Sequence, residues 1–269
     1  MSGTEGAIGG GYPIDPTLER RWGVADNGDV YEVAVRPHLL DELRRRWPPL
    51  GLERRSTPSG PVLARIGLSD RWVVVPDAET SGDDPPEVAW DLLERSLAVF
   101  AALRLENLVA VHAAVIGWHG QALVVPALSG GGKSTLSRAA HEAGATVLSD
   151  EYTLIDPTSG LVSGWNRPVR ILTGDGGVDR LDIAVRSEPI PVGCVAFLTY
   201  DADRANTWAE IDRGAASARL LSHTICAKSR PDDSLDAALR ALASARAVAG
   251  TRGEAADAVA ELLALTASR

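Results

Sequence analysis

The sequence is poor in cysteine, in long apolar runs and in clustered positive charge. Its 269 residues include only two cysteines, Cys194 and Cys226, and neither belongs to a spaced pair, which argues against a disulfide framework and a zinc site. The net charge of -9, with no basic stripe, argues against a nucleic-acid partner. No apolar run approaches the ~20 residues that span a bilayer, so no membrane partner is expected.

The start of the chain also lacks the marks of a targeting segment. Residues 1–13 are rich in glycine, with no basic start and no apolar core, so they do not read as a secretory signal. We predict a disordered tail over residues 1–15. With few cysteines and no signal, a cytoplasmic location is the default expectation.

The overall composition, with 45% hydrophobic and 23% charged residues, is typical of a globular protein. Alternating apolar residues in 30–35, 61–68 and 71–76 predict strands, and 37–47 predicts a short helix. We therefore predict a small N-terminal α+β unit over 16–85, closed by an acidic, proline-containing loop.

A second domain is predicted over 86–269. It begins with a helix that has one apolar stripe and runs to about residue 105. The apolar segments 108–116 and 121–127 are joined by only four residues, so they must form an antiparallel hairpin. A helix follows and stops at Gly144, and a strand follows at 146–149.

The remainder of the second domain is predicted from turn signals and alanine content. Residues 151–165 read as another hairpin and 191–200 as a strand. The alanine-rich segment 234–249 is predicted to be a helix that Ser234 caps and Gly250 ends. A last helix is expected over about 253–266.

The segment from Ala127 to Ser134, ALSGGGKS, follows the phosphate-loop pattern G-x-x-x-x-G-K-[ST] with alanine in the first glycine position. Glycines there let successive amides converge on an anion, and the helix adds its positive end. Lys133 can reach the outer phosphates, and Ser134 offers an oxygen to Mg²⁺. The expected ligands are ATP and Mg²⁺. The predicted nucleotide contacts are Ser129, Gly130, Gly131, Gly132, Lys133, Ser134 and Thr135.

Three further residues are candidates for chemistry. Asp150 and Glu151 end the next strand, where a carboxylate can hold Mg²⁺ or take the proton of an attacking hydroxyl. The alternative is that they are solvated acids at a strand end. His112 interrupts an apolar strand, and considered alone it is typical of a hydrogen-bonded core residue.

The order VHAAVIGWHGQALVVPALSGGGKSTL…GATVLSDE resembles the HPr kinase/phosphorylase family and its shorter serine-kinase-like relatives, which include precursor-peptide kinases of lasso-peptide type. The resemblance covers about residues 108–200, and a hairpin before the phosphate loop separates this family from most phosphate-loop enzymes. It implies an α/β fold with a mixed sheet. It also implies that His112 belongs to the active site, that Asp150 is the general base, and that Glu151 adds a Mg²⁺ contact.

The chain departs from the family where a glutamate, arginine and glycine signature is expected. Residues 166–174, NRPVRILTG, carry no acid but offer Arg167 and Arg170 as contacts for a phosphate or an acceptor. Other basic candidates are His223, Lys228 and Arg230. No segment matches the loop that docks HPr, so HPr is not the expected substrate and reverse phosphorolysis is not implied.

The sequence thus predicts an ATP- and Mg²⁺-dependent kinase that phosphorylates a serine-type hydroxyl of a peptide or protein, with a biosynthetic precursor peptide as one candidate. Two alternatives stay open: a kinase of a small alcohol or free amino acid, and a nucleotide-binding regulatory protein without catalysis. Relatives form hexamers, but the C-terminal region differs too much to carry an oligomeric state over.

Overall fold

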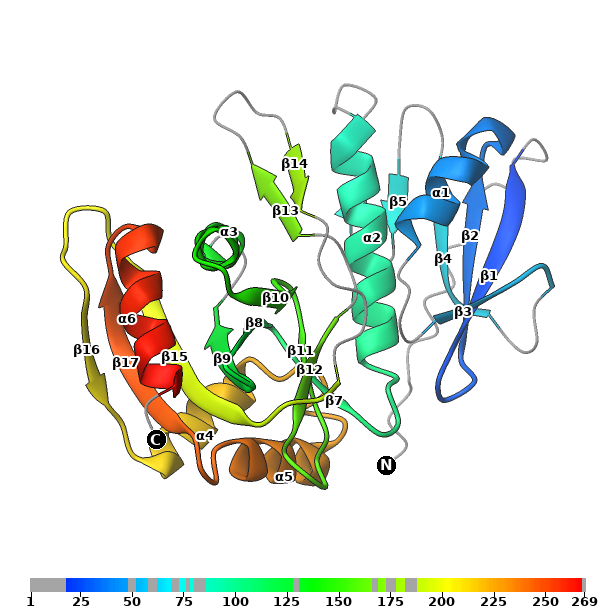
Figure 1. Cartoon of the computed structure of the whole chain (residues 1–269). Coiled ribbons are helices and arrows are strands. Elements are labelled where there is room, and N and C mark those ends of the chain that lie inside the picture. The colour runs from blue at the N-terminus through cyan, green and yellow to red at the C-terminus, as the bar shows by residue number, and fades with distance from the viewer. Residues whose placement is uncertain are drawn as a thin grey trace. The chain divides into compact units, whose positions relative to one another are not determined.

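A computed structural model shows a mixed α/β protein (Figure 1). The structure describes residues 18–47, 52–57, 62–68, 73–75, 78–79, 86–127, 131–165, 169–172, 178–181 and 188–267. The predicted tail, residues 1–15, lies outside them. The chain divides into two compact units, Met1–Glu106 and Asn107–Arg269.

The first unit is built on a six-stranded mixed sheet in the order β3-β1-β2-β4-β5-β6. Strand β1 runs antiparallel to β2 and β3, whereas β2 and β4 are parallel. The predicted strands are confirmed as β2, β4 and β5, and the predicted helix as η1 and α1. Its elements before α2 are β1 Glu19–Ala25, β2 Val30–Val35, η1 Pro37–Leu39, α1 Leu40–Arg46, β3 Leu52–Arg55, β4 Val62–Leu68, β5 Val73–Val75 and β6 Ala78–Glu79.

Helix α2, Pro86–Ala102, belongs to the first unit, although the sequence places the boundary before it. Its apolar stripe is buried, with Leu93 and Leu97 both fully covered. The Tyr31 hydroxyl of β2 lies 2.9 Å from Ser96 Oγ, and the Tyr31 and Phe100 rings meet edge to face at 4.7 Å. The stripe therefore packs against the strands that precede it in the chain.

The second unit is centred on another six-stranded mixed sheet, ordered β10-β8-β9-β15-β17-β16. Strand β8 is antiparallel to β9 and β10, and β15 is parallel to β9 and β17. The predicted hairpin is thus confirmed. Its two-residue turn, His119-Gly120, has positive φ at both residues, which suits a hairpin. The strands are β8 Ala113–Trp118, β9 Gln121–Pro126, β10 Thr146–Ser149, β15 Val192–Tyr200, β16 Thr207–Glu210 and β17 Arg246–Arg252.

Helices cover both faces of this sheet (Figure 1). Along β9, Leu123 and Val125 join the core under α3 and α6, whereas Ala122 and Val124 join the core under α4 and α5. Because side chains alternate between faces, both sets must be apolar, which explains the continuous apolar run. The helices are α3 Lys133–Glu142, α4 Arg213–Ser222, α5 Pro231–Ala241 and α6 Ala255–Ala267.

Two smaller sheets complete the second unit. The predicted hairpin over 151–165 is confirmed by β11 and β12, which are joined to β7 in a three-stranded sheet. A separate hairpin, β13 and β14, occupies part of the stretch that carries Arg170. The strands are β7 Val109–Val111, β11 Thr153–Ile155, β12 Val162–Gly164, β13 Val169–Leu172 and β14 Val178–Leu181. No helix in the described ranges is long and apolar enough to cross a membrane.

The predicted helix over 234–249 is wrong. Helix α5 begins at Pro231 and ends at Ala241, and residues 246–252 form strand β17. Ser234 does not cap the helix; it is buried inside it, and its Oγ donates to the Arg230 carbonyl oxygen at 2.7 Å. Alanine favours helix locally, but parallel pairing with β15 decides the conformation of the second half.

We predict that Gly250→Ala destabilises the protein by about 2 kcal/mol. Gly250 lies opposite Trp208 in the β16–β17 pair, and an added β-carbon would collide with the Thr207 carbonyl oxygen. Urea unfolding measures the loss. Gly117→Ala, inside strand β8, is the matched control and should change stability much less, because its added β-carbon would meet only ordinary contacts at 3.5 Å or more. Equal stability of the two variants would contradict the placement of Gly250 in a strand.

Candidate functional site

The candidate site lies at one edge of the second sheet, where several strand ends meet. Since β8 is antiparallel to both of its neighbours, β9 and β10 run in the same direction. Their carboxyl ends therefore lie at one edge, together with the amino end of β8 and the carboxyl ends of β15 and β17. The topology brings together the phosphate loop, His112, Asp150, Tyr200 and Arg252.

Gly132 forms the junction between the phosphate loop and helix α3. It adopts a left-handed conformation, with φ of 75°, and is the residue that precedes the helix. Its carbonyl oxygen accepts from Leu136, but no side chain caps the first turn. The helix therefore presents its amino end to an anion, with Thr135 exposed there. The other predicted loop contacts, Ser129 and Gly130, lie outside the described residues.

Lys133, one of two lysines in the chain, is buried with 8% of its surface exposed. Its Nζ donates to the Ala127 carbonyl oxygen at 2.7 Å, which holds the ammonium across the base of the loop. Burial lowers the pKa of Lys133, and the nearby Asp150 and Glu151 carboxylates oppose that shift. A buried ammonium with two acids close by is suited to binding phosphate oxygens in exchange for the carbonyl contact.

Ser134 and Asp150 meet directly. Ser134 Oγ donates to Asp150 Oδ2 at 2.5 Å, so the hydroxyl on the first turn of α3 touches the carboxylate that follows β10. The backbone amides of Glu151 and Tyr152 donate to Ser149 Oγ at 3.2 and 3.3 Å, which forms a turn after the strand. This turn keeps both acids at the sheet edge.

The donor set fits Mg²⁺. Hydroxyl and carboxylate oxygens are the ligands that Mg²⁺ prefers, and it keeps several positions for phosphates and water. Ser134 and Asp150 supply one of each within hydrogen-bonding distance. No group of three or more His, Cys, Asp and Glu side chains gathers among the described residues, and an ion shared with a nucleotide does not require one.

The main chain of His112 is hydrogen-bonded both to the start of the phosphate-loop segment and to the residue that follows helix α4. Its carbonyl oxygen accepts from the Ala127 amide at 3.4 Å, and its own amide donates to the His223 carbonyl oxygen at 2.8 Å. Its half-buried ring lies 5.9 Å from the Tyr152 ring, centre to centre. The histidine thus interrupts the apolar run between β7 and β8 at the sheet edge that carries the loop.

His223, which the sequence offers only as one basic candidate, lies close to the buried lysine. Burial and the positive charge of Lys133 both lower the pKa of His223. Its Nδ1 is buried and has no hydrogen-bond partner in the described part of the chain. A neutral imidazole in this place leaves the positive charge concentrated on Lys133.

Arg252 is the residue that the sequence analysis missed. Only 3% of its surface is exposed, and its Nη2 donates to the Gly132 carbonyl oxygen at 3.3 Å. Its guanidinium also lies 4.7 Å from the centre of the Tyr200 ring. Because residues 234–249 were predicted to form a helix, no strand end was expected at Arg252. The β-branched and small residues before Arg252, followed by glycine, are the signal that could have predicted a strand end.

The remaining basic candidates are not brought to this edge by any described contact. Arg167 lies outside the described residues, and for Arg170 only the backbone in β13 is described. Arg230 pairs with Asp233 at 2.8 Å and donates to the Leu108 carbonyl oxygen at 3.1 Å, so it fixes the start of α5. Lys228 is exposed.

No protein-family model matches the chain, and a search of curated proteins finds no match. The interpretation of the site therefore depends on its own geometry.

We predict that Gly132→Ala lowers affinity for ADP at least tenfold, about 1.4 kcal/mol. An added β-carbon would collide with Arg252 Nη2, and alanine is strained at this φ. Isothermal titration measures the affinity. Gly144→Ala is the matched control, since it changes a left-handed glycine after the other end of α3 with open space around it. Equal loss in both variants would contradict a phosphate site at Gly132.

We also predict that nucleotide affinity falls at alkaline pH and does so earlier in Asp150→Asn. Only the ammonium form of Lys133 binds phosphate well, and burial already lowers its pKa. Removal of the Asp150 charge takes away one opposing effect, so the pKa falls further and the affinity loss shifts to lower pH. ADP titrations without metal, at pH values from 7 to about 11, measure it. An unshifted pH profile would contradict the electrostatic coupling.

Proposed function

We propose that the protein is an ATP- and Mg²⁺-dependent kinase that transfers the γ-phosphoryl group to a serine-type hydroxyl. The observation that carries the proposal is the 2.5 Å contact between Ser134 and Asp150, beside the buried Lys133. It joins a phosphate loop, a metal-ligating hydroxyl and a carboxylate in one place. These are the parts that phosphoryl transfer requires, because its catalysis is mainly positioning and charge stabilisation.

The phosphate chain of ATP would lie over the amino end of α3. Amides of the glycine loop and the uncapped helix turn donate to its oxygens, and Lys133 Nζ exchanges the Ala127 carbonyl for the outer phosphates. Arg252 is proposed as a positioning residue, since its guanidinium donates to the Gly132 carbonyl oxygen. A bound Mg²⁺ would neutralise phosphate charge, with Ser134 and Asp150 or Glu151 as its protein ligands.

Asp150 is also the group that would activate the acceptor. Its Oδ2 faces Ser134, and the carboxylate accepts the proton as the acceptor oxygen attacks the γ-phosphorus and ADP leaves. Glu151, next in the chain, contributes to the negative potential at Lys133. His112, at the same edge, is proposed to face the acceptor or the transferred phosphoryl group.

The resemblance to HPr-kinase-like proteins supports a peptide or protein acceptor. The hairpin of β8 and β9 ahead of the phosphate loop is the feature of that family that the chain shares. A domain of the HPr-kinase type, with a biosynthetic precursor peptide as one possible acceptor, is accordingly part of the proposal. A small alcohol is the alternative acceptor that the same chemistry would serve.

We predict that Asp150→Asn lowers phosphoryl transfer at least 10²-fold, the usual contribution of a general base, while ADP at neutral pH still binds. The assay uses radiolabelled ATP, Mg²⁺ and a pool of synthetic serine-containing peptides, with free serine and glycerol as separate acceptors. Glu142→Gln, on the exposed end of α3, is the control and should retain activity.

The outcomes separate the alternatives. Label in peptides supports the peptide kinase, and label in serine or glycerol alone supports the small-molecule kinase. Nucleotide binding without transfer to any acceptor favours a regulatory protein. Full activity of the Asp150→Asn variant would contradict the assignment of Asp150 as the general base.

A further inference from the structure

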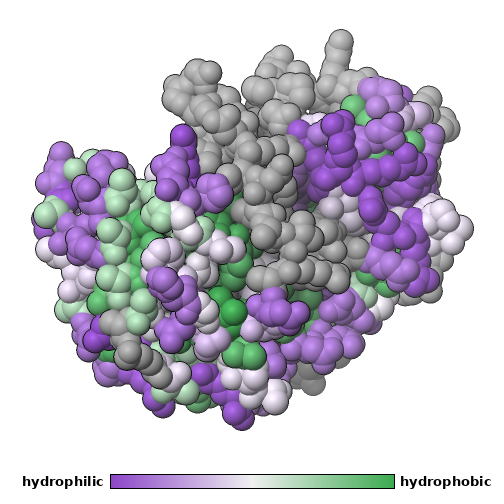
Figure 2. All heavy atoms as spheres, viewed as in Figure 1, coloured by the Kyte–Doolittle hydropathy of each residue, from purple (hydrophilic) through white to green (hydrophobic). Residues whose placement is uncertain are grey.

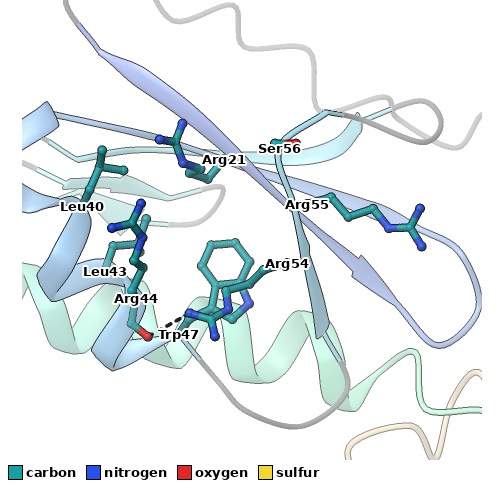
Figure 3. A pocket seen from close by; sticks show the side chains of 8 residues that line it. All are labelled: Arg21, Leu40, Leu43, Arg44, Trp47, Arg54, Arg55 and Ser56. Atoms are coloured by element: carbon teal, nitrogen blue, oxygen red, sulfur yellow. Dashed lines mark hydrogen bonds between the residues drawn. The ribbon is translucent and has the colours of Figure 1, made fainter.

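The first unit contains a pocket between helix α1 and the edge of its sheet (Figure 3). Its volume of about 330 Å³ is at the small end for ligand pockets. The lining residues are Leu40, Leu43, Arg44 and Trp47 from the helix side and Arg21, Arg54, Arg55 and Ser56 from the strand side. A pocket of this size holds one apolar side chain and one charged group beside it.

The positions of the lining residues follow from the periodicity of a helix and the periodicity of a strand. The four helix-side residues are spaced by three and four positions, so they share one face of α1. On β1, Arg21 and Gly23 point to the same side of the sheet, and Gly23 pairs with Arg54 of β3. Arg21 and Arg54 therefore lie on the same face of the sheet.

The charges around the pocket leave one guanidinium without a carboxylate. Arg21 pairs with Glu19 at 2.6 Å, and Arg44 pairs with Asp41 at 2.7 Å. Arg54 donates only to the Arg44 carbonyl oxygen, at 3.0 Å, and within the described ranges it has no ion pair (Figure 3). Hydrophilic residues dominate the surface around α1 (Figure 2).

The indole N–H of Trp47 is a second group at the pocket that could bind a ligand. The residue is 6% exposed, and its indole Nε1 is buried without a hydrogen-bond partner in the part of the chain that the structure describes. Buried N–H groups are normally paired. A carboxylate held by Arg54 would bring acceptor oxygens to the same pocket.

We propose that this pocket binds an extended peptide segment in which a carboxylate and an apolar side chain lie two positions apart, on the same face. The carboxylate pairs with Arg54, and the apolar side chain packs on Leu40, Leu43 and Trp47. A single unpaired guanidinium balances a carboxylate better than a phosphate dianion. In a kinase this pocket would anchor the acceptor peptide away from its serine; that role rests on the proposed function, whereas the binding itself does not.

A peptide is favoured over a free acid because the pocket lies along an edge strand. Strand β3 ends the sheet order, and its described partner is β1 alone. An edge strand offers backbone donors and acceptors to an added extended segment, while neighbouring pockets read its side chains. An acidic and apolar segment would thus gain both kinds of contact.

The test uses the full chain without nucleotide, so it is independent of phosphotransfer. The probes are the acetylated and amidated pentapeptide Gly-Leu-Gly-Glu-Gly and its counterpart with Gln in place of Glu. Titration calorimetry should show that the Glu peptide binds at least tenfold more tightly. In Arg54→Gln the two peptides should agree within twofold.

The matched control is Arg45→Gln, which should keep the tenfold preference. Arg45 lies on α1, is not among the residues that line the pocket, and pairs with Glu42. Equal binding of both peptides to the unchanged protein, or the same preference in Arg54→Gln, would overturn the site. N-acetylleucine binding as tightly as the Glu peptide would overturn the peptide assignment.

Discussion

The antiparallel pairing of β8 with β9 is the constraint on which the candidate site depends. Two residues between these strands permit no other arrangement, and β10 then returns alongside β8 in the direction of β9. The phosphate loop and Asp150 consequently leave the sheet at the same edge. A crossover in place of the hairpin would separate Ser134 from the carboxylate that it contacts.

The same edge also controls the chemistry of its ionisable groups. Lys133 is buried and donates to the Ala127 carbonyl oxygen, and its pKa reflects a balance between desolvation and the acids after β10. Arg252 arrives from β17 and fixes Gly132 in a conformation that glycine alone adopts without strain. Backbone geometry and charge at this edge are therefore set by residues from different strands.

Local patterns in the sequence predicted the parts that local forces decide. The hairpin and the end of α3 at Gly144 follow from turn length, glycine position and periodicity, and the structure has both. The phosphate loop stays a prediction, since residues 128–130 lie outside the described residues. The C-terminal region could not be predicted in this way, because alanine-rich residues become β17 only through pairing with the distant β15. Because β17 was not predicted as a strand, Arg252 was not predicted as a site residue either. His223 was visible as a basic residue, but its position near Lys133 depends on the fold.

The charge balance at the edge indicates why a metal would be needed there. Lys133 and Arg252 bring two positive charges, whereas Asp150, Glu151 and Glu254 bring three negative ones, so the negative charges outnumber the positive ones. In the proposed function, a nucleoside triphosphate would add about four negative charges to a site where burial already weakens solvation. A divalent cation would offset two of them, and the helix end and loop amides would act on the remainder. Removal of the Asp150 charge would ease nucleotide entry electrostatically while it weakens the metal site and the acceptance of a proton, so nucleotide binding and phosphoryl transfer should respond to this residue in different ways.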